Sequence, residues 1–338
     1  MKAFFLIKPG VIEIREINVP VPRRDEVLLK VKMVGFCGGD LNGYRGLFKL
    51  QEYPNILGHE LGATIEQTGA NVPDKFKVGM NVTLNPYLNC GICNSCRKGY
   101  SNACQDNRTM GVRRPGVMAQ FITAHWKTLY SSNKLSHKEL ALVEPLSVGF
   151  HAVNRGRVNS KDRVAVIGCG MVGIGALAAS VNRGSEVIAV DIDDSKMEIA
   201  KKIGVTNTIN TSKTNLHKAL AEITCGDGPD VIIEAAGNPL TYKAAIEEVA
   251  YKGRVICVGY TNRPVEINTD IFVKKEIEVL GARNSIDEFT EVISYLESGK
   301  FPVNEVITKI VFIDEAENAL IEWSDNPGTI TKIMVTFD

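Results

Sequence analysis

The stretch from Arg163 to Asp191, RVAVIGCGMVGIGALAASVNRGSEVIAVD, decides the fold of this chain. Its glycines divide it into a buried strand at 163–168, a tight turn, a helix that ends at Gly184, and a second strand from 186. Within it, the 18 residues from Val164 to Val181 are uncharged and apolar and could also suggest a membrane span, but a spanning helix would not need these glycines. The pattern therefore predicts a βαβ unit.

A glycine motif follows the first of these strands and opens the helix, which is the context in which G-x-G-x-x-G has structural meaning. Gly168 permits the tight turn, Gly170 lets backbone approach a pyrophosphate, and Gly173 lets the helix pack on the strand. Asp191 ends the second strand, where a carboxylate accepts hydrogen bonds from ribose hydroxyls and repels a 2′-phosphate, which favours NAD over NADP. Asp193 is expected to begin the following helix. The predicted cofactor-binding residues are Gly168, Gly170, Met171, Val172, Gly173 and Asp191.

Strands and helices continue to alternate after Asp191, with strands predicted at 230–237, 253–260 and 277–283. This alternation predicts an α/β fold with a doubly wound parallel sheet. Residues before 150 read instead as short strands with Gly and Pro breaks and little helical periodicity. The C-terminal tail, from about Ser285 to the end of the sequence, is too short to be a domain. We therefore expect it to complete the β-rich domain. The predicted domains are 1–152 with 286–338, and an inserted nucleotide-binding domain at 153–285.

Four cysteines, Cys90, Cys93, Cys96 and Cys104, form the pattern C-x2-C-x2-C-x7-C. This spacing indicates a closed zinc site with a structural role, because protein ligands fill every coordination position. The chain has 8 cysteines and no evident secretory leader, which favours metal ligands over disulfides. An iron–sulfur cluster is the other alternative, but ferredoxin-type runs usually carry a proline after the final cysteine, where this chain has Gln105.

A second set of mixed ligand types comprises Cys37 in GFCGGD, His59 and Glu60 in LGHELG, and Glu144 in VEPLSVG. A catalytic zinc keeps three protein ligands and one open position, and an alcohol bound there becomes acidic enough to ionise near neutral pH. Taken singly, His59 could be a core histidine and Cys37 a buried thiol. The joint pattern predicts a catalytic zinc, with Glu60 or Glu144 as the third ligand, and hence two zinc ions per chain.

The motifs CGGD, GHE, the four-cysteine loop, EPLSVG and GCGMVG, in this order, resemble those of the zinc-dependent medium-chain alcohol and polyol dehydrogenases. The resemblance spans nearly the whole chain and implies a GroES-like catalytic domain, an inserted Rossmann domain, and a homodimer or homotetramer. Glu60 and Glu144-Pro145 are similar to the sorbitol, threonine and sugar-acid dehydrogenase branches. The resemblance further implies that Glu144 is a zinc ligand or a neighbouring carboxylate that exchanges with a ligand. It also implies that Asp40 orients the histidine ligand.

The proton relay of that family has a gap here, because Gly39 stands where members commonly have Ser or Thr. A water, an exchanging Glu60 or the hydroxyl of Tyr44 could replace it. His151 reads equally well as an ordinary helix residue and is not included. The predicted catalytic residues are Cys37, His59, Glu60, Glu144 and Tyr44.

The expected reaction is hydride transfer from a secondary alcohol of a polyol or sugar acid, such as a hexonate, to C4 of NAD, giving the ketone. Arg113, Arg114 and the pair Arg283-Asn284 are expected near the substrate, because arginines favour carboxylate or polyhydroxy groups. The alternatives are a threonine 3-dehydrogenase-like oxidation of an amino alcohol and a non-catalytic zinc protein that binds NAD(H) as a redox sensor.

The bulk composition excludes some partners. The 39 basic and 39 acidic residues give zero formal net charge and leave no electrostatic footprint for nucleic acid or an anionic membrane. The apolar run in MKAFFLIKPG is too short for the core of a signal peptide. We therefore expect a cytoplasmic protein whose partner is a small molecule.

Overall fold

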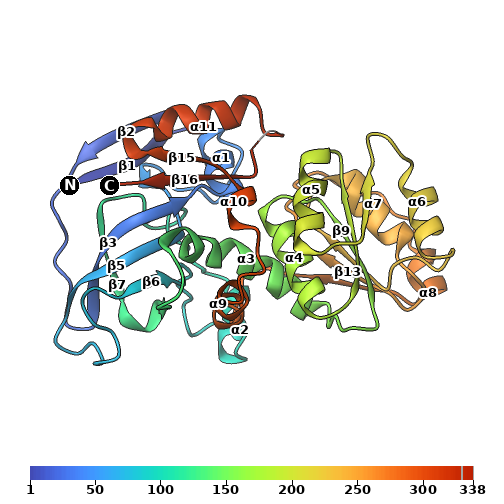
Figure 1. Cartoon of the computed structure of the whole chain (residues 1–338), viewed down its shortest axis with the longest axis horizontal. Coiled ribbons are helices and arrows are strands. Elements are labelled where there is room, and N and C mark those ends of the chain that lie inside the picture. The colour runs from blue at the N-terminus through green and yellow to red at the C-terminus, as the bar shows by residue number, and fades with distance from the viewer. Residues whose placement is uncertain (329, 338) are drawn as a thin grey trace. The chain divides into compact units, whose positions relative to one another are not determined.

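The computed structural model describes residues 1–328 and 330–337, and its chain contacts divide the protein into two compact units (Figure 1). The β-rich unit comprises Met1–Glu144, Phe289–Ser298 and Val303–Asp338, and the nucleotide unit comprises Pro145–Glu288 and Gly299–Pro302. The sequence places the boundaries at 152/153 and 285/286. The contact boundaries fall at 144/145 and 288/289 instead, because helix α3 (His137–Arg155) contributes to both units.

The nucleotide unit is built on a parallel sheet with the strand order β11-β10-β9-β12-β13-β14. The central strands β9, β10, β12 and β13 are largely apolar and mostly buried, as expected for a sheet covered by helices on both faces. The order reverses beside β9, which is the topological switch point of a doubly wound fold. The strands are β9 (Arg163–Ile167), β10 (Glu186–Asp191), β11 (Asn207–Asn210), β12 (Val231–Glu234), β13 (Arg254–Cys257) and β14 (Glu278–Gly281).

The helices of the nucleotide unit alternate with these strands, as predicted. Helix α5 begins after Asp193, whose side chain accepts a hydrogen bond from the Ser195 N–H, and it ends at Gly204, which has a left-handed φ of 106°. The helices are α4 (Met171–Asn182), α5 (Asp194–Ile203), α6 (Leu216–Ile223), α7 (Pro239–Glu248) and α8 (Asp270–Lys275).

The β-rich unit contains a mixed sheet with the order β15-β16-β3-β5-β6-β8, with β7 paired to β3, and a smaller antiparallel sheet, β2-β1-β4. Its core is formed by the inward residues of both sheets together with those of α11. The strands are β1 (Lys2–Lys8), β2 (Val11–Glu16), β3 (Glu26–Gly35), β4 (Asn55–Ile56), β5 (Glu60–Thr68), β6 (Asn81–Leu84), β7 (Phe121–His125), β8 (Leu129–Ser131), β15 (Ile307–Phe312) and β16 (Lys332–Thr336).

The C-terminal tail completes this unit, as the sequence predicted. Strand β16 pairs antiparallel with β3, so the red end of the chain lies beside the blue one in Figure 1. Asp338, the last residue of the predicted segment 286–338, lies outside the described residues. The remaining helices are α1 (Gly38–Tyr44), α2 (Asn94–Arg97), α9 (Phe289–Glu297), α10 (Val303–Val306) and α11 (Ala316–Asp325).

Helix α3 is one of the elements whose extent the sequence patterns did not predict. Most of its residues from Leu140 to Val153 are buried, so the segment is apolar on all sides and shows no amphipathic period. It also contains Pro145, which usually ends or kinks a helix. The structure confirms the α/β fold with a GroES-like and a Rossmann-type unit. Among the described residues, no helix has the length and apolar character of a membrane span.

Candidate active site and cofactor sites

The predicted glycine motif forms the turn between β9 and α4. A Cβ on Gly168 would lie 2.7 Å from the Ala236 nitrogen, and one on Gly173 would overlap the Gly168 carbonyl. Gly170, in contrast, has no atom within 4 Å of its Cβ position. Gly168 and Gly173 are thus needed for packing. Gly170 leaves open space at the N-terminus of α4, where a phosphate would find backbone N–H groups.

Asp191 lies at the carboxyl end of β10, beside this turn. One carboxylate oxygen accepts from the Cys169 N–H at 2.7 Å, and the other accepts from Ile192 N–H at 2.7 Å and Asp193 N–H at 3.2 Å. The nearest ammonium is that of Lys196, 3.9 Å away. Asp191 therefore fixes the turn to the second strand and keeps a carboxylate where a ribose hydroxyl would bind.

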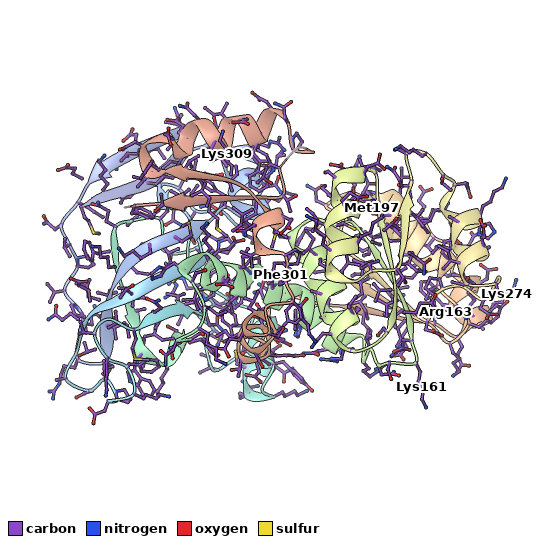
Figure 2. The ribbon with its side chains drawn as sticks, in the orientation of Figure 1. Lys161, Arg163, Met197, Lys274, Phe301 and Lys309 are labelled. Carbon is purple, nitrogen blue, oxygen red and sulfur yellow. The ribbon has the colours of Figure 1, made fainter. Side chains whose placement is uncertain are left out.

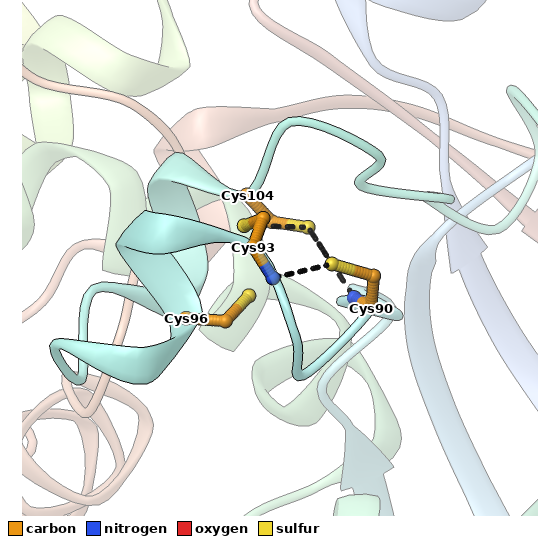
Figure 3. A group of neighbouring side chains, drawn as sticks. All are labelled: Cys90, Cys93, Cys96 and Cys104. Carbon is orange, nitrogen blue, oxygen red and sulfur yellow. Dashed lines mark hydrogen bonds between the residues drawn. The ribbon is translucent and has the colours of Figure 1, made fainter.

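The four cysteines of the loop between β6 and β7 lie together (Figure 3). Their sulfur atoms all lie within 4.8 Å of one another, and Sγ of Cys104 is 3.5 Å from Sγ of Cys90. Backbone N–H groups of Cys96 and Gln105 lower the pKa of Cys93 to about 6, whereas burial and neighbouring thiols raise that of Cys96 to about 12. Four thiols at this separation are the donor set of a structural zinc site, and a bound cation would hold all four as thiolates.

The second ligand set lies wholly within the β-rich unit. Ligand atoms of Cys37, His59 and Glu60 lie within 4.8 Å of one another, and His59 and Glu60 are buried. Cys37 is the N-cap of α1, while His59 and Glu60 lead into β5. Nδ1 of His59 is buried and has no hydrogen-bond partner among the described residues.

Asp40 joins the two segments that carry these ligands. Its carboxylate accepts from the Cys37 N–H at 2.8 Å and from the Gly58 N–H at 3.3 Å. Burial opposes the charged form of His59, but Asp40, Cys37 and Glu144 together raise the pKa of His59 well above its usual range. Asp40 therefore affects His59 in two ways. It fixes the backbone of Gly58, which precedes His59, and its negative charge favours the protonated form of the imidazole.

Glu60 is paired with a lysine that sequence analysis missed. Nζ of Lys332, on β16, lies 2.7 Å from both carboxylate oxygens of Glu60 and 2.9 Å from the Phe36 carbonyl oxygen. A Cβ on Gly35 would overlap Oε2 of Glu60, so the carboxylate occupies space that only glycine leaves. Burial raises the pKa of Glu60 to about 7, and Lys332 opposes that shift.

Glu144 lies close to this set but is not part of the three-ligand group. Its carboxylate accepts a short hydrogen bond from the hydroxyl of Tyr87, a second residue that the sequence did not identify. Burial and the charge of Glu144 raise the pKa of Tyr87 well above its usual range, so this hydroxyl keeps its proton. No sequence motif marks Tyr87 or Lys332, because each reaches the site only through tertiary folding.

The other residues considered from the sequence are Tyr44, His151 and the pair Arg283-Asn284. The ring of Tyr44 packs against the hydrophobic core, and its hydroxyl makes no hydrogen bond to a described residue. Arg283 and Asn284 belong to the nucleotide unit. His151 pairs with Glu288, with Nδ1 2.8 Å from Oε1, in the same unit. The structure therefore gives no contact that supports a relay role for Tyr44.

A cavity of about 660 Å³ lies elsewhere, at the amino ends of β9 and β12. Its lining includes Lys161 and Arg163, both labelled in Figure 2, and Lys275. It lies at the opposite edge of the sheet from the glycine turn. Arg163 is paired with Glu186, and Lys275 donates to two backbone carbonyls, so we assign the cavity no role in the chemistry.

Comparison with known proteins identifies the family. Residues 23–134 match the model of the alcohol dehydrogenase GroES-like domain, and residues 171–298 match that of the zinc-binding dehydrogenase. The sorbitol dehydrogenase of Bacillus subtilis is 32% identical over 99% of this chain and 97% of its own. The chain belongs to the zinc-type medium-chain alcohol and polyol dehydrogenase family.

Two further relatives of this zinc-type dehydrogenase are informative. The 2-dehydro-3-deoxy-L-galactonate 5-dehydrogenase of Pseudoalteromonas atlantica is 31% identical over 90% of each chain. The crystal structure of the alcohol dehydrogenase rspB from Escherichia coli CFT073 with NADH has a TM-score of 0.92, with 28% identity over 100% of this chain and 99% of that one. The dehydrogenase is thus an oxidoreductase for secondary alcohols that uses zinc and a nicotinamide cofactor.

The residues of both ligand sets fit zinc. The four thiols are a closed structural set, while Cys37, His59 and Glu60 offer one sulfur, one nitrogen and one oxygen and leave a position for substrate. The buried His59 nitrogen without a partner agrees with such a site.

Proposed function

We propose that the protein oxidises a secondary hydroxyl of a polyol or sugar acid to the ketone, with NAD as acceptor and two zinc ions per chain. The observation that carries this proposal is the Cys37–His59–Glu60 group, in which His59 and Glu60 are buried and the three different ligand atoms lie within 4.8 Å of one another. A purely structural metal site would not need this mixed, incomplete set.

A zinc ion held by Cys37, His59 and Glu60 would act as a Lewis acid that makes the substrate hydroxyl acidic. The substrate carbon gives a hydride to the nicotinamide and the hydroxyl gives up a proton, so the products are a ketone, NADH and one proton. The Gly168–Gly173 turn and Asp191 would hold the pyrophosphate and the adenosine ribose. We propose NAD rather than NADP because of the Asp191 carboxylate.

The proton needs a route, because Gly39 carries no hydroxyl. We propose that Glu144 accepts it, directly or through water, and that Tyr87 orients Glu144. Tyr87 donates to this carboxylate, and the charge of Glu144 acts on both His59 and Glu60. The pair therefore supplies an acceptor close to the ligand group.

The test is NADH formation by zinc-loaded protein with polyols, aldonates, threonine and simple alcohols, with NADP in parallel and metal content measured. Turnover of a polyol or aldonate with NAD, at two zinc ions per chain, is expected. Turnover of threonine alone would replace the substrate class with the amino-alcohol alternative. Tight NADH binding without any turnover would favour a non-catalytic sensor.

A further inference from the structure

The loop from Met110 to Gly116 packs on the two backbone segments that lead into the candidate active site. A Cβ on Gly111 would lie 2.7 Å from the Gly58 carbonyl oxygen, and Gly58 precedes the ligand His59. The Met110 N–H donates to the Pro86 carbonyl at 3.1 Å, and Pro86 precedes Tyr87. The backbone of this loop is therefore held against the segments that carry His59 and Tyr87.

Buried amides fix the loop in place. The Gln51 side chain donates to the Gly111 carbonyl at 3.1 Å, and Asn55 donates to the carbonyls of Val112 and Arg114 at 3.2 Å each. Gln51 and Asn55 are themselves buried. The loop is thus organised before any ligand arrives, which lowers the entropy that binding must offset.

The two arginines of this loop have different surroundings. Arg113 forms ion pairs with Asp106 at 2.9 Å and Glu52 at 3.5 Å, and both acids are more than half exposed. Its charge is already neutralised at the surface. The sequence alone could not separate Arg113 from Arg114, whereas these contacts exclude Arg113 as a free anion ligand.

Arg114 has no such partner. Of the five N–H donors of a guanidinium, one makes a long bond of 3.4 Å to the Pro86 carbonyl, and the buried Nε–H has no acceptor among the described residues. No carboxylate within the described ranges pairs with it. Burial, and then the like charge of Arg108, lower the pKa of Arg114. A half-buried cation beside a second cation, with its donors unused, is unfavourable unless an anion binds there.

We propose that Arg114, supported by Arg108, binds an anionic group of the substrate, so that the enzyme acts on a polyol carrying a carboxylate or a phosphate. A guanidinium matches the paired oxygens of either group with two parallel hydrogen bonds. Arg108 is exposed and unpaired within the described residues, and it adds to the attraction. This proposal rests on the proposed function and narrows its substrate class.

The experiment compares kcat/KM for three substrate types on the NAD- and zinc-loaded enzyme: hexonates, polyol phosphates and the matching uncharged polyols. Arg114→Met should lower kcat/KM for the preferred anionic type by roughly 30-fold or more, because a charged pair is lost. Arg114→Met should change kcat/KM for an uncharged polyol by less than about twofold. Arg114→Lys should recover part of the kcat/KM that Arg114→Met loses with the anionic substrate. Arg113→Met is the matched control and should leave both values unchanged. The hexonate and phosphate arms identify which anion the site takes.

The proposal would be overturned if Arg113→Met and Arg114→Met lowered kcat/KM for the anionic substrate equally. It would also be overturned if the wild-type enzyme preferred uncharged polyols and Arg114→Met kept this preference. If Arg114→Met does not fold, Arg108→Met provides the test, because its side chain is exposed; KM for the anionic substrate should rise about threefold. An unchanged KM in Arg108→Met would then count against the anion site. If no substrate reacts at all, the proposed function fails. Saturable binding of inorganic phosphate or of acetate to the NADH complex, weakened in Arg114→Met, would still support the anion site, and the absence of binding by both anions would exclude it.

Discussion

At the scale of single residues, the Glu60–Lys332 pair decides the charge of the candidate metal site. Both side chains are at most 2% exposed. The Lys332 ammonium donates hydrogen bonds to both carboxylate oxygens of Glu60 and to the Phe36 carbonyl oxygen. Lys332 therefore balances the negative charge of Glu60 when no metal does. It also draws the carboxylate into the space above Gly35, so Lys332 and a metal ion compete for the same oxygens.

Lys332→Met should destabilise the metal-free protein by about 3–5 kcal/mol, because it leaves a buried carboxylate without a counter-charge. The loss should be smaller in zinc-loaded protein, since the metal supplies positive charge to Glu60. Urea unfolding of both forms measures the difference. Lys309→Met, at a half-buried lysine of the adjacent strand (Figure 2) that pairs with the exposed Glu322, is the control and should cost little in either form. Equal losses with and without zinc would show that Glu60 does not reach the metal.

The proton route gives a second residue-scale prediction. Tyr87→Phe should lower kcat by roughly 10²-fold, because Glu144 loses the hydroxyl that orients it. Gly39→Ser should then restore part of the rate, since a Cβ at Gly39 would meet only Cys37 Sγ at 3.8 Å and Phe48 at 4.0 Å. The measurement is the pH profile of kcat together with zinc content. Tyr100→Phe, at an exposed tyrosine of the same unit, is the control; a lowered zinc content in Tyr87→Phe would mean that Tyr87 only supports the metal site.

At the scale of elements, the contact between helix α3 and the segment Ile286–Glu288 depends on one buried acid. Oε1 of Glu288 lies 2.8 Å from Nδ1 of His151 and accepts from the Asn154 amide, while Oε2 accepts from the Ile286 N–H at 2.7 Å. Burial would raise the pKa of Glu288, but the hydrogen bonds from His151 and Ile286 outweigh it and lower that pKa. The carboxylate thus joins helix α3 to the residues that precede α9.

This shift predicts a pH dependence of stability. Because the folded pKa of Glu288 lies below its unfolded value, about 4.3, its stabilisation is fully present above that value. It is lost as the pH falls through the folded pKa. Glu288→Gln should therefore cost about 1–3 kcal/mol near neutral pH, and the gap to wild type should close on acidification. Urea unfolding across this range, with Asp287→Asn as the exposed control, measures it. A gap that stays constant with pH would show that Glu288 acts through packing alone.

Most of the fold could be predicted from the sequence wherever local pattern and tertiary structure agree. The nucleotide unit is such a case, because apolar strands, glycine turns and caps such as Asp193 all indicate the same elements. Helix α3 could not be predicted, since full burial removes the helical period and Pro145 argues against a helix. The ligands Cys37 and His59 stand out by residue type, whereas Lys332 joins them from the far end of the chain by β16–β3 pairing, which no local pattern encodes.

At the scale of the whole molecule, the two kinds of chemistry belong to different units. All eight candidate zinc ligands, including Glu144, lie in the β-rich unit, and the glycine turn with Asp191 lies in the nucleotide unit. The β-rich unit is also assembled from three separate chain segments, whereas the adenosine-binding residues come from one continuous stretch. Cofactor binding and metal binding should therefore be separable in the intact chain.

Removing the two proposed zinc ions with a chelator should abolish turnover while NADH affinity changes by less than about threefold, because the residues proposed to hold the pyrophosphate and ribose belong to the nucleotide unit and both ligand sets belong to the β-rich unit. The same treatment should lower the unfolding temperature, since the four-cysteine loop loses the ion that neutralises its thiolates. NADH fluorescence titration and thermal unfolding, before and after zinc is restored, measure the two effects. Asp191→Ala is the converse control: it should weaken NADH binding and leave the zinc content unchanged. A large loss of NADH affinity on chelation would instead show that the fold of the nucleotide unit depends on the metal-bound state of its neighbour.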